Sequence, residues 1–269
     1  MLKELSIIIV HHRTPGFLKL CLDSVKQTCA SLDYELVVVD SMSTRESRDI
    51  VTERTASVQF LTSNENLGFS RGVNWGIKHS SGQYILILNP DIILTDGAVL
   101  RMLNFMKKHA DVGMLGPQLR NFNNTIQQSY FSFYRPITIP ARRGILSGFR
   151  PFRRALADFT MADADTSKIQ TPDWLMGSAL MVSRAAVDQV GLMDERFFMY
   201  FEDVDWARRF WHNGYKVVYF PEAIFYHYHQ RESKSRFGVW DAILNRKTRW
   251  HIHSALKFFL KYRKLAQLR

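Results

Sequence analysis

The chain has 269 residues, of which 46% are hydrophobic and 23% are charged. This length supplies one large or two small globular domains with ample material for a hydrophobic core. No apolar run approaches the ~18 residues of a membrane-spanning helix. The apolar segment 5–10 is too short for the core of a secretory signal peptide, so we expect a cytoplasmic protein. Cys21 and Cys29 are the only cysteines, and we expect both to be reduced.

The positive charge is concentrated in two segments of the chain. The net charge is +11, and residues 230–269 carry eleven Lys or Arg against Glu232 and Asp241. Residues 141–154 carry five Arg and no acidic residue, so the rest of the chain is mildly acidic. Basic segments of this kind indicate an anionic partner, such as a membrane surface, a nucleic acid or a phosphorylated lipid.

Hydrophobic patterning in the first 110 residues alternates between strand and helix. Buried strands are predicted at 5–10, 35–39, 58–61 and 84–88. Helices are predicted at 15–28, 44–54, 70–80 and 97–109. Strands that alternate with helices are typical of a parallel, doubly wound sheet with helices on both faces.

The second half of the chain is less regular. A strand is predicted at 112–115, and residues 120–172 form a long excursion, which is usually functional or disordered. Regularity returns at 174–182, where Gly177 interrupts it. A strand is predicted at 216–220 and is stopped by Pro221, and 224–229 is predicted to be a strand or a loop. Helices are predicted at 185–190, closed by Gly191, at 203–213, capped by Gly214, and from about 239 to the end.

Two carboxylates follow predicted strands and should lie at one edge of the sheet. Asp40 follows the second strand, and Asp91 follows the strand 84–88 after Asn89 and Pro90. Ligands of open α/β sheets bind at this edge, so these carboxylates are placed to hold a cation or a polar ligand. Either Asp alone could instead cap a turn.

The loop and helix at 64–80 offer a possible phosphate site. Gly68 and Arg71 place bare backbone and a cation near the start of a helix, an arrangement that binds phosphate. Gly72 and Gly76 lie on one helix face, and at Gly76 we expect close packing of the helix on the sheet.

A second acidic group, Glu202, Asp203 and Asp205, begins a predicted helix. Acidic residues in a first helical turn can simply favour the helix dipole. The preceding segment 197–201 is strongly apolar, however, and desolvated carboxylates are better bases. His227 and His229 follow the last strand and could be structural, or could join Asp91.

Four motifs in order give the chain a resemblance to a known family. They are Val37–Ser43, Asn66–Ile77, Asn89–Asp91 and Phe201–Arg209. Together they resemble the inverting glycosyltransferases of family 2, and most of all the bacterial rhamnosyltransferase-type branch, over residues 5–235. The resemblance implies a GT-A fold, with a mostly parallel central sheet flanked by helices. It also implies a catalytic domain at 1–235, with a nucleotide-sugar half at 1–115 and an acceptor half at 116–235, and a basic amphipathic helical tail at 236–269.

The resemblance also implies roles for individual residues. The nucleotide-sugar donor would be bound by His11, Asp40, Asn66, Gly68, Arg71 and Asn89, with Asp40 on the base or ribose. Asp91 would bind Mg²⁺ or Mn²⁺ on the diphosphate, helped by His227 or, alternatively, His229. Asp203 would be the catalytic base. The acceptor would be bound by Trp174, Met176, Gly177 and Glu202. The chain departs from the family pattern in Asn89, where a second carboxylate is usual, and in the pair His11 and His12.

These roles describe a one-step displacement. A base removes the proton of the acceptor hydroxyl as the new bond forms, and a divalent cation stabilises the diphosphate leaving group. The resemblance implies transfer of a sugar, with L-rhamnose from dTDP-rhamnose as the example, to a polysaccharide or lipid-linked acceptor in cell-surface glycan biosynthesis. The basic tail would hold the protein on the inner face of the cell membrane, with Trp250, Phe258 and Phe259 entering the interface.

Three alternatives remain open at this point. The chain could be a sugar nucleotidyltransferase, although residues 11–15 do not form the Gly-rich basic loop that such an enzyme needs. It could also be a noncatalytic basic module that binds membranes or nucleic acid, which would not require Asp91 or Asp203. The aromatic residues of the tail could instead pack on the catalytic domain. For the glycosyltransferase itself, no nucleic acid partner is expected.

Overall fold

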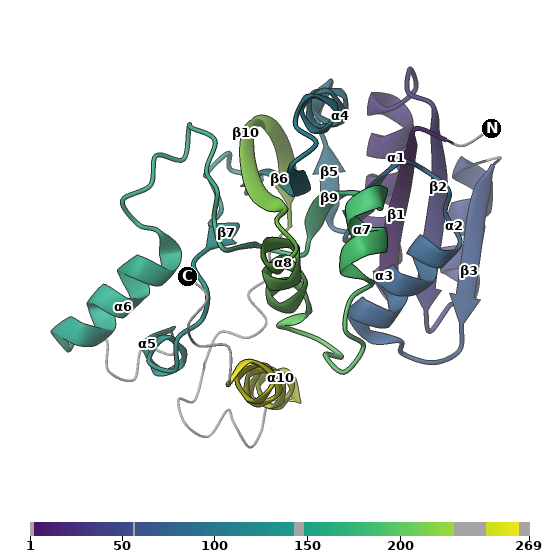
Figure 1. Cartoon of the computed structure of the whole chain (residues 1–269). Helices are drawn as coiled ribbons and strands as arrows, with labels where there is room; N and C mark the ends of the chain where they lie inside the picture. The colour runs from purple at the N-terminus through teal and green to yellow at the C-terminus, as the bar shows by residue number, and fades with distance from the viewer. Residues whose placement is uncertain (1–2, 56, 143–147, 229–245, 264–269) are drawn as a thin grey trace.

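A mixed eight-stranded sheet runs through the computed structural model, which describes residues 3–55, 57–142, 148–228 and 246–263 (Figure 1). The strand order is β3-β2-β1-β4-β9-β6-β10-β5. These strands are β1 (Leu5–His12), β2 (Tyr34–Ser41), β3 (Val58–Ser63), β4 (Tyr84–Leu88), β5 (Ile92–Leu94), β6 (Val112–Arg120), β9 (Ala179–Ser183) and β10 (Lys216–His227). A small second sheet pairs β7 (Tyr130–Phe131) with β8 (Trp174–Leu175).

The predicted parallel arrangement holds for the N-terminal strands. β3, β2, β1 and β4 are parallel neighbours, and residues 5–11 of β1 are buried throughout, as expected for a strand covered on both faces. β9 then enters antiparallel between β4 and β6, and β5 pairs antiparallel with β10. This reversal brings the chain segment just before β9 to the edge where β4 ends, since Ala179 pairs with Leu88.

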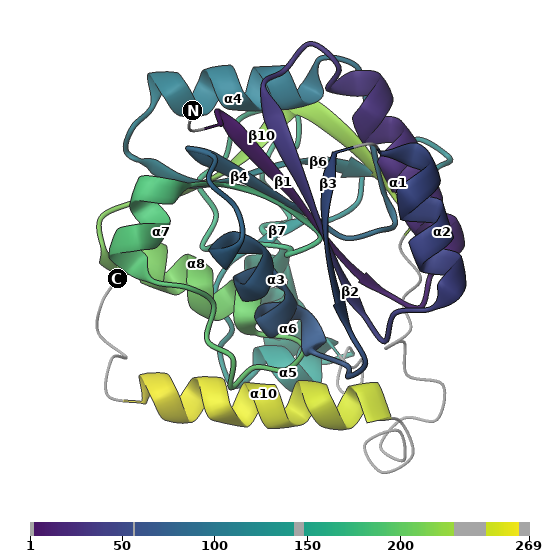
Figure 2. The ribbon, with the colours of Figure 1, turned by 90° about the vertical axis from the view of Figure 1, so that its right-hand side faces the viewer.

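Helices cover both faces of the sheet and enclose two hydrophobic cores (Figure 2). One face carries α1 (Pro15–Thr28), α2 (Arg45–Arg54) and α4 (Ala98–Lys108). The other carries α3 (Gly68–Lys78), α7 (Arg184–Val190) and α8 (Glu202–His212). Side chains of β1 alternate between these cores, with Ile7 and Ile9 facing α1 and Ile8 facing α3.

The glycines of α3 allow the close packing predicted from the sequence. A Cβ atom at Gly76 would lie 2.4 Å from the Ile8 side chain, and one at Gly72 would lie 2.7 Å from Val10. Both glycines therefore let α3 approach β1, which fixes the position of the loop that precedes this helix.

The predicted excursion at 120–172 contains regular structure. α5 (Thr138–Arg142) and α6 (Arg150–Thr160) project away from the main sheet (Figure 1). Aromatic packing holds this region to the body: the ring of Trp174 stacks on Phe131 at 4.6 Å, and Phe159 stacks on Phe131 at 5.1 Å. The sequence did not predict these helices, because the region has little hydrophobic periodicity and its contacts are aromatic and nonlocal.

The prediction that Pro221 ends a strand is wrong. β10 continues through Pro221 to His227, and its register against β6 shifts between Phe220 and Ile224. A proline lacks an N–H group but is tolerated at such an irregularity. The continuation matters because it carries His227 to the edge of the sheet next to Asp91.

The C-terminal helix α10 (Arg246–Tyr262) packs below α8, as Figure 2 shows. Phe258 and Tyr262 are buried in the same core as Phe201. The expectation that Phe258 enters a membrane interface is therefore wrong, because its ring lies 5.4 Å from that of Phe201. Trp250 and Phe259 are half-buried, and Trp250 packs 5.0 Å from the ring of Phe198. Among the described residues, no helix has the length and apolar character needed to cross a bilayer.

Candidate active site

The ends of β1 and β2 carry a buried histidine–carboxylate pair. His11 and Asp40 are paired in the strand register, and His11 Nδ1 lies 2.7 Å from Asp40 Oδ1. Ser47 Oγ donates to Asp40 Oδ2 at 2.6 Å, and the same serine completes the capping box of α2 with Thr44. Both oxygens of Asp40 thus bind protein side chains, and the residue is fully buried.

The hydrogen bonds around His11 define its tautomer. The Thr14 backbone N–H donates to Nε2 at 2.9 Å, so Nε2 must be an acceptor. The proton therefore lies on Nδ1 and is donated to Asp40. Burial raises the pKa of Asp40, but hydrogen bonds from His11, Ser47 and Ser43 outweigh it and leave the pKa below its ordinary value. The pair is a neutral imidazole on an ionised carboxylate.

The loop before α3 packs tightly against the segment before α8. Gly68 has φ +71°, and a Cβ atom there would lie 2.4 Å from the Phe198 carbonyl oxygen. Its N–H binds Asn66 Oδ1 at 3.0 Å, and the next N–H, of Phe69, binds the Phe198 carbonyl. Arg71 is exposed on α3. The structure thus gives Gly68 and Asn66 a role in joining two loops, and their binding of the donor stays a prediction.

Asp91 and His227 meet at the end of β4, as the sequence predicts. Their Oδ2 and Nε2 atoms are 3.4 Å apart, and the pairing of β10 with β5 brings them together. Asp91 Oδ1 is buried and has no hydrogen-bond partner among the described residues. His229, the alternative ligand, lies outside the described residues.

Gln127 holds the imidazole of His227 in a fixed orientation. The Gln127 amide donates through Nε2 to the His227 carbonyl and to Asn121 Oδ1, so its Oε1 accepts from His227 Nδ1 at 2.9 Å. Nδ1 carries the proton, and Nε2 points to Asp91. An imidazole anchored through its other nitrogen is the usual arrangement of a metal ligand. The residues present therefore fit a divalent cation, although no cluster of three or more ligand side chains occurs in the described part of the chain.

A short path of backbone segments and two hydrogen bonds joins Asp91 to Asp203, the predicted base. Asn89 is half-buried, and its N–H donates to the Ser178 carbonyl at 2.8 Å. The adjacent Gly177 N–H donates to Asp203 Oδ2 at 3.0 Å. A Cβ atom at Gly177 would lie 3.2 Å from the Phe69 ring and in ordinary contact, 3.4 Å, with the Asp203 carboxylate. The segment before β9 thus fixes Asp203 relative to the end of β4.

The first turn of α8 holds two carboxyl groups that resist ionisation. Burial raises the pKa of Asp203 to about 6, against the opposing effect of hydrogen bonds from Gly177 and Val204. Burial, together with the charge of Asp203, raises the pKa of Glu202 well above its ordinary value. The neutral form of Glu202 is therefore favoured next to Asp203, the predicted base. The raised pKa of Asp203 suits proton abstraction.

The backbone before α8 is strained. Tyr200 and Phe201 both have φ of 69°, a left-handed conformation that non-glycine residues seldom adopt. Consecutive residues in this region persist only where their surroundings impose them, and they occur preferentially at functional sites. Here the packing of Phe201 against Tyr134 and Phe258 holds the turn that presents Glu202 and Asp203.

The predicted acceptor residues differ in position. Gly177 contacts Asp203 directly, and Met176 is half-buried next to it. Trp174 is buried among aromatic rings, and its Nε1 donates to the Ser132 carbonyl. It lies beneath the site and supports it, so its direct contact with an acceptor stays a prediction.

Buried polar atoms without partners collect along this edge of the sheet. In the described part of the chain they include Oγ1 of Thr14, Oδ1 of Asp91, Oγ of Ser129, Oγ of Ser178 and Oε2 of Glu202. Thr14 follows β1, Asp91 follows β4, and Ser178 precedes the paired end of β9. Unpaired buried polar atoms are costly, so their convergence marks a site that a polar ligand completes.

Sequence reasoning missed three residues of this site. Ser47 holds Asp40, Gln127 holds His227, and Arg142 makes a hydrogen bond to Tyr134 beside the α8 turn. The Thr44–Ser47 capping box offered a signal for Ser47. Gln127 and Arg142 lie in the irregular segment, where neither spacing nor motif singles them out.

Comparison with known proteins identifies the family. The model for "Glycosyl transferase family 2" matches residues 6–164, which span β1 to α6. The chain belongs to glycosyltransferase family 2. The sequence-based resemblance is thus confirmed, and the protein is a glycosyltransferase with a role in glycan biosynthesis.

Two relatives of this family 2 chain have rhamnosyltransferase names. The N-acetylglucosaminyl-diphospho-decaprenol L-rhamnosyltransferase of Mycobacterium tuberculosis is 29% identical over 215 residues, which cover 75% of this chain and 68% of that protein. Rhamnosyltransferase WbbL of Escherichia coli K12 is 22% identical over 271 residues, covering 97% and 94% of the two chains. The structure resembles a crystal structure of GalNAc-T7 with UDP, GalNAc and Mn²⁺, with TM-score 0.64, 15% identity and coverage of 86% of this chain and 45% of that one. That likeness confirms the GT-A fold.

Proposed function

We propose that this glycosyltransferase moves a sugar from a nucleoside diphosphate donor to a glycan or lipid-linked acceptor with inversion of the anomeric carbon. The rhamnosyltransferase names of the relatives support L-rhamnose from dTDP-rhamnose as the donor. The observation that carries the proposal is Asp203, a carboxylate with a pKa of about 6 that Gly177 fixes next to the end of β4.

Asp203 acts as the general base in this proposal. Its carboxylate accepts the proton of the acceptor hydroxyl while the hydroxyl oxygen bonds to the anomeric carbon. The bond from that carbon to the diphosphate oxygen breaks in the same step, so the sugar inverts and no covalent enzyme intermediate forms. Glu202, whose pKa is raised by burial and by the charge of Asp203, orients the acceptor through a hydrogen bond.

Asp91 and His227 would hold Mg²⁺ or Mn²⁺ on the donor diphosphate. The unpaired Oδ1 of Asp91 and the anchored imidazole of His227 support this assignment, as does the Mn²⁺ in the GalNAc-T7 structure. When bound, the cation would stabilise the negative charge that develops on the leaving group. His11, Asp40, Asn66, Gly68, Arg71 and Asn89 would contact the rest of the donor. The division into a donor half at 1–115 and an acceptor half at 116–235 belongs to the same proposal.

A combined binding and transfer experiment tests this function. The full chain is screened by thermal shift against nucleotide sugars with and without Mn²⁺, and transfer and donor hydrolysis are measured with the stabilising sugar. We expect Asp203→Asn to lower kcat about 10²- to 10⁴-fold with little change in donor binding. Asp188→Asn, an exposed carboxylate on α7, serves as the matched control and should keep full activity. Unchanged turnover in a folded Asp203→Asn variant would exclude Asp203 as the base.

We also propose that α10 brings the enzyme to an anionic membrane surface. Its outward face exposes Leu256 by 58% and Leu260 by 63%, together with Arg249 and Arg263. Basic residues beside a membrane contribute about 1 kcal/mol each. Cosedimentation with vesicles should therefore be strong for anionic lipid and weak for neutral lipid. Leu256→Ser with Leu260→Ser should lower binding several-fold, and equal binding to both vesicle types would contradict the proposal.

A further inference from the structure

We propose that Arg142 and Tyr134 form a subsite that binds a phosphate group of the acceptor beside the catalytic base. This inference rests on the proposed function and names the chemical class of acceptor that the site would take: a sugar or lipid that carries a phosphate ester. Neither residue belongs to the motifs that define the family resemblance.

Arg142 ends α5 with its side chain exposed and held in place. Its Nη1 donates to the Tyr134 hydroxyl, and its guanidinium lies over the rings of Tyr134 at 5.6 Å and Phe159 at 5.2 Å. Within the described residues it makes no ion pair with a carboxylate. An arginine whose orientation is fixed by aromatic rings, and whose remaining N–H groups face solvent, is prepared for bidentate binding of phosphate.

Tyr134 supplies a second donor next to the guanidinium. Its ring is buried between those of Phe159 and Phe201, at 4.6 Å from each. Burial raises the pKa of Tyr134 to about 12, so the hydroxyl keeps its proton. The hydroxyl oxygen accepts from Arg142, and the structure gives its hydrogen no acceptor among the described residues. The Tyr134 O–H and the N–H groups of Arg142 that do not bind Tyr134 therefore belong to adjacent groups.

This pair of donors lies next to Asp203. Tyr134 packs on Phe201, the residue that begins α8, and the charges of Arg142 and Asp203 influence each other. One route of contacts runs from Asp91 through Asn89, Ser178 and Gly177 to Asp203. A second route runs from the first turn of α8 through Phe201 to Tyr134. Along these two routes Asp203 stands between the proposed metal ligands and Arg142. A phosphate at Arg142 would therefore belong to the acceptor rather than to the donor.

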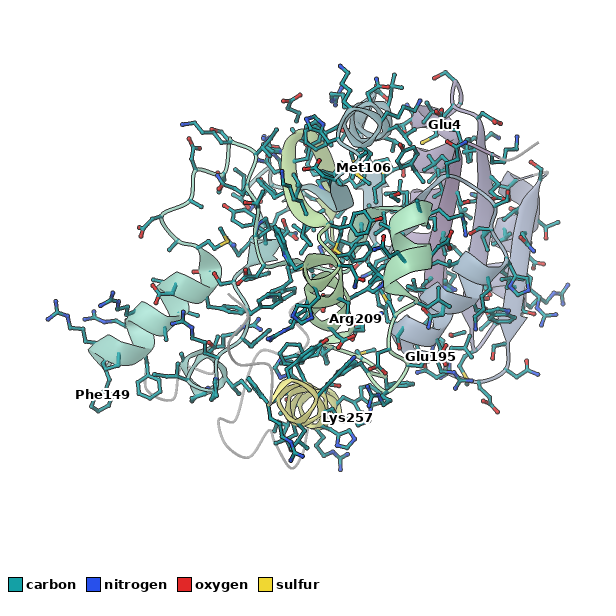
Figure 3. The ribbon with its side chains drawn as sticks, viewed as in Figure 1. Glu4, Met106, Phe149, Glu195, Arg209 and Lys257 are labelled. Atoms are coloured by element: carbon teal, nitrogen blue, oxygen red, sulfur yellow. The ribbon has the colours of Figure 1, made fainter. Side chains whose placement is uncertain are left out.

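The surroundings of Arg142 suit an anion. Burial and the charge of Asp203 raise the pKa of Glu202 well above its ordinary value, which favours its neutral form, and the charge of Asp203 acts on Tyr134. α10 packs against the turn that begins α8, where the His251 ring lies 5.3 Å from both Tyr200 and Phe201. The next helix, α6, extends outward to Phe149, labelled in Figure 3, and exposes further arginines.

Calorimetric titration of the full chain with n-hexyl phosphate tests the subsite, with n-hexyl β-glucoside as the neutral probe. The titration is made with and without a saturating nucleotide sugar and Mn²⁺, which fill the donor site. We expect the phosphate ester to bind in both conditions and the glucoside to bind much more weakly. Arg142→Gln should weaken binding of the ester about 10-fold or more, since hydrogen bonds to charged groups are strong. Tyr134→Phe, which keeps the ring, should weaken it about 3-fold.

Arg153→Gln on α6 is the matched control, because it removes the same charge from an exposed position. It should change binding of the ester less than about 2-fold. An equal loss in Arg142→Gln and Arg153→Gln would mean a diffuse basic surface and would overturn the subsite. Inorganic phosphate is titrated in parallel, and its binding without binding of the ester would mean a free-anion site, which also overturns the proposal.

The experiment separates this inference from the proposed function. Failure of every nucleotide sugar to stabilise the wild-type chain would refute the proposed function, whatever the phosphate ester does. Unchanged binding of the ester by a folded Arg142→Gln variant, with the donor response intact, would refute the subsite alone. Loss of the donor response in Arg142→Gln would assign Arg142 to the donor diphosphate and overturn the acceptor assignment. If Arg142→Gln does not fold, Tyr134→Phe decides the question.

Discussion

Two aspartates of α8, two residues apart, have opposite environments. Asp203 accepts hydrogen bonds from the backbone N–H groups of Gly177 and Val204, and burial raises its pKa to about 6. Asp205 is fully buried among cations: Arg209 Nε lies 3.0 Å from Oδ2, and Lys261 Nζ lies 2.5 Å from Oδ1. Tyr262 also donates to Oδ1. Figure 3 shows Arg209 of α8 and Lys257 of α10 in the region where the two helices meet.

The difference teaches how one helix turn serves two purposes. Successive residues of an α-helix are rotated by about 100°, so positions two apart face nearly opposite directions. Asp203 therefore faces β9 and the site, whereas Asp205 faces α10. Asp203 lacks the close cationic partners that Asp205 has, and its pKa is raised. The partners of Asp205 attach the C-terminal helix. Environment, not residue type, assigns the roles.

Replacing Asp205 by Ala should have the largest effect on stability. It would leave Lys261 and Arg209 at the α8–α10 junction without their buried partner, and breaking a buried ion pair costs about 3–5 kcal/mol. Urea unfolding followed by circular dichroism measures the free energy of unfolding. Asp188→Ala, on the exposed face of α7, should change it by less than about 0.5 kcal/mol. A loss below about 1 kcal/mol for Asp205→Ala would show that α10 is held by other contacts.

The pH dependence of turnover should report Asp203. Because the base must be ionised, and its pKa is raised to about 6, kcat/KM should be level above that pH and fall about tenfold per unit below it. The rate is measured from pH 4.5 to 8.5, with circular dichroism at each pH to confirm that the chain stays folded. A value of kcat/KM that stays level down to pH 4.5 would mean that the base has an ordinary carboxylate pKa and is not Asp203.

A methyl group at Gly177 should have a smaller, local effect. Its Cβ atom would lie 3.2 Å from the Phe69 ring and in ordinary contact, 3.4 Å, with Asp203, so the ring or the Gly177 backbone, whose N–H binds Asp203 Oδ2, must shift by a few tenths of an ångström. We expect Gly177→Ala to lower kcat about 10-fold, because misplaced catalytic groups lose rate steeply. Gly16→Ala, where nothing lies within 4 Å, should leave kcat unchanged. Equal activity of both variants would show that Asp203 tolerates movement.

Local pattern was sufficient for most of the N-terminal half. The segment 84–88 is apolar throughout and is bounded by Gly82 and Pro90, so β4 was predicted with its exact limits. The prediction failed at Pro221, where β10 continues through an irregularity, and in the segment 120–172, where aromatic contacts replace periodicity. In both places contacts between segments far apart in the chain decide the structure, and the pattern of neighbouring residues does not predict it.

The site shows the same division between local and nonlocal information. Asp91 and His227 were predicted to meet, and they do. The roles predicted for Asp40, Asn66, Gly68 and the acceptor residues stay predictions. Gln127 could not be found from the sequence, because its importance depends on the amide orientation that His227 and Asn121 impose.

The sequence by itself determined most of the strand–helix order of the N-terminal half, the carboxylates at the strand ends and the family. These features are encoded by side chains close together in the chain, whose spacing follows the periods of strands and helices. Only the tertiary structure decided that the pKa of Asp203 is raised while Asp205 anchors α10, and that the charge of Arg142 acts on Asp203. Burial, ion pairing and ring packing arise between segments far apart in the chain, and they set the chemistry of each carboxylate.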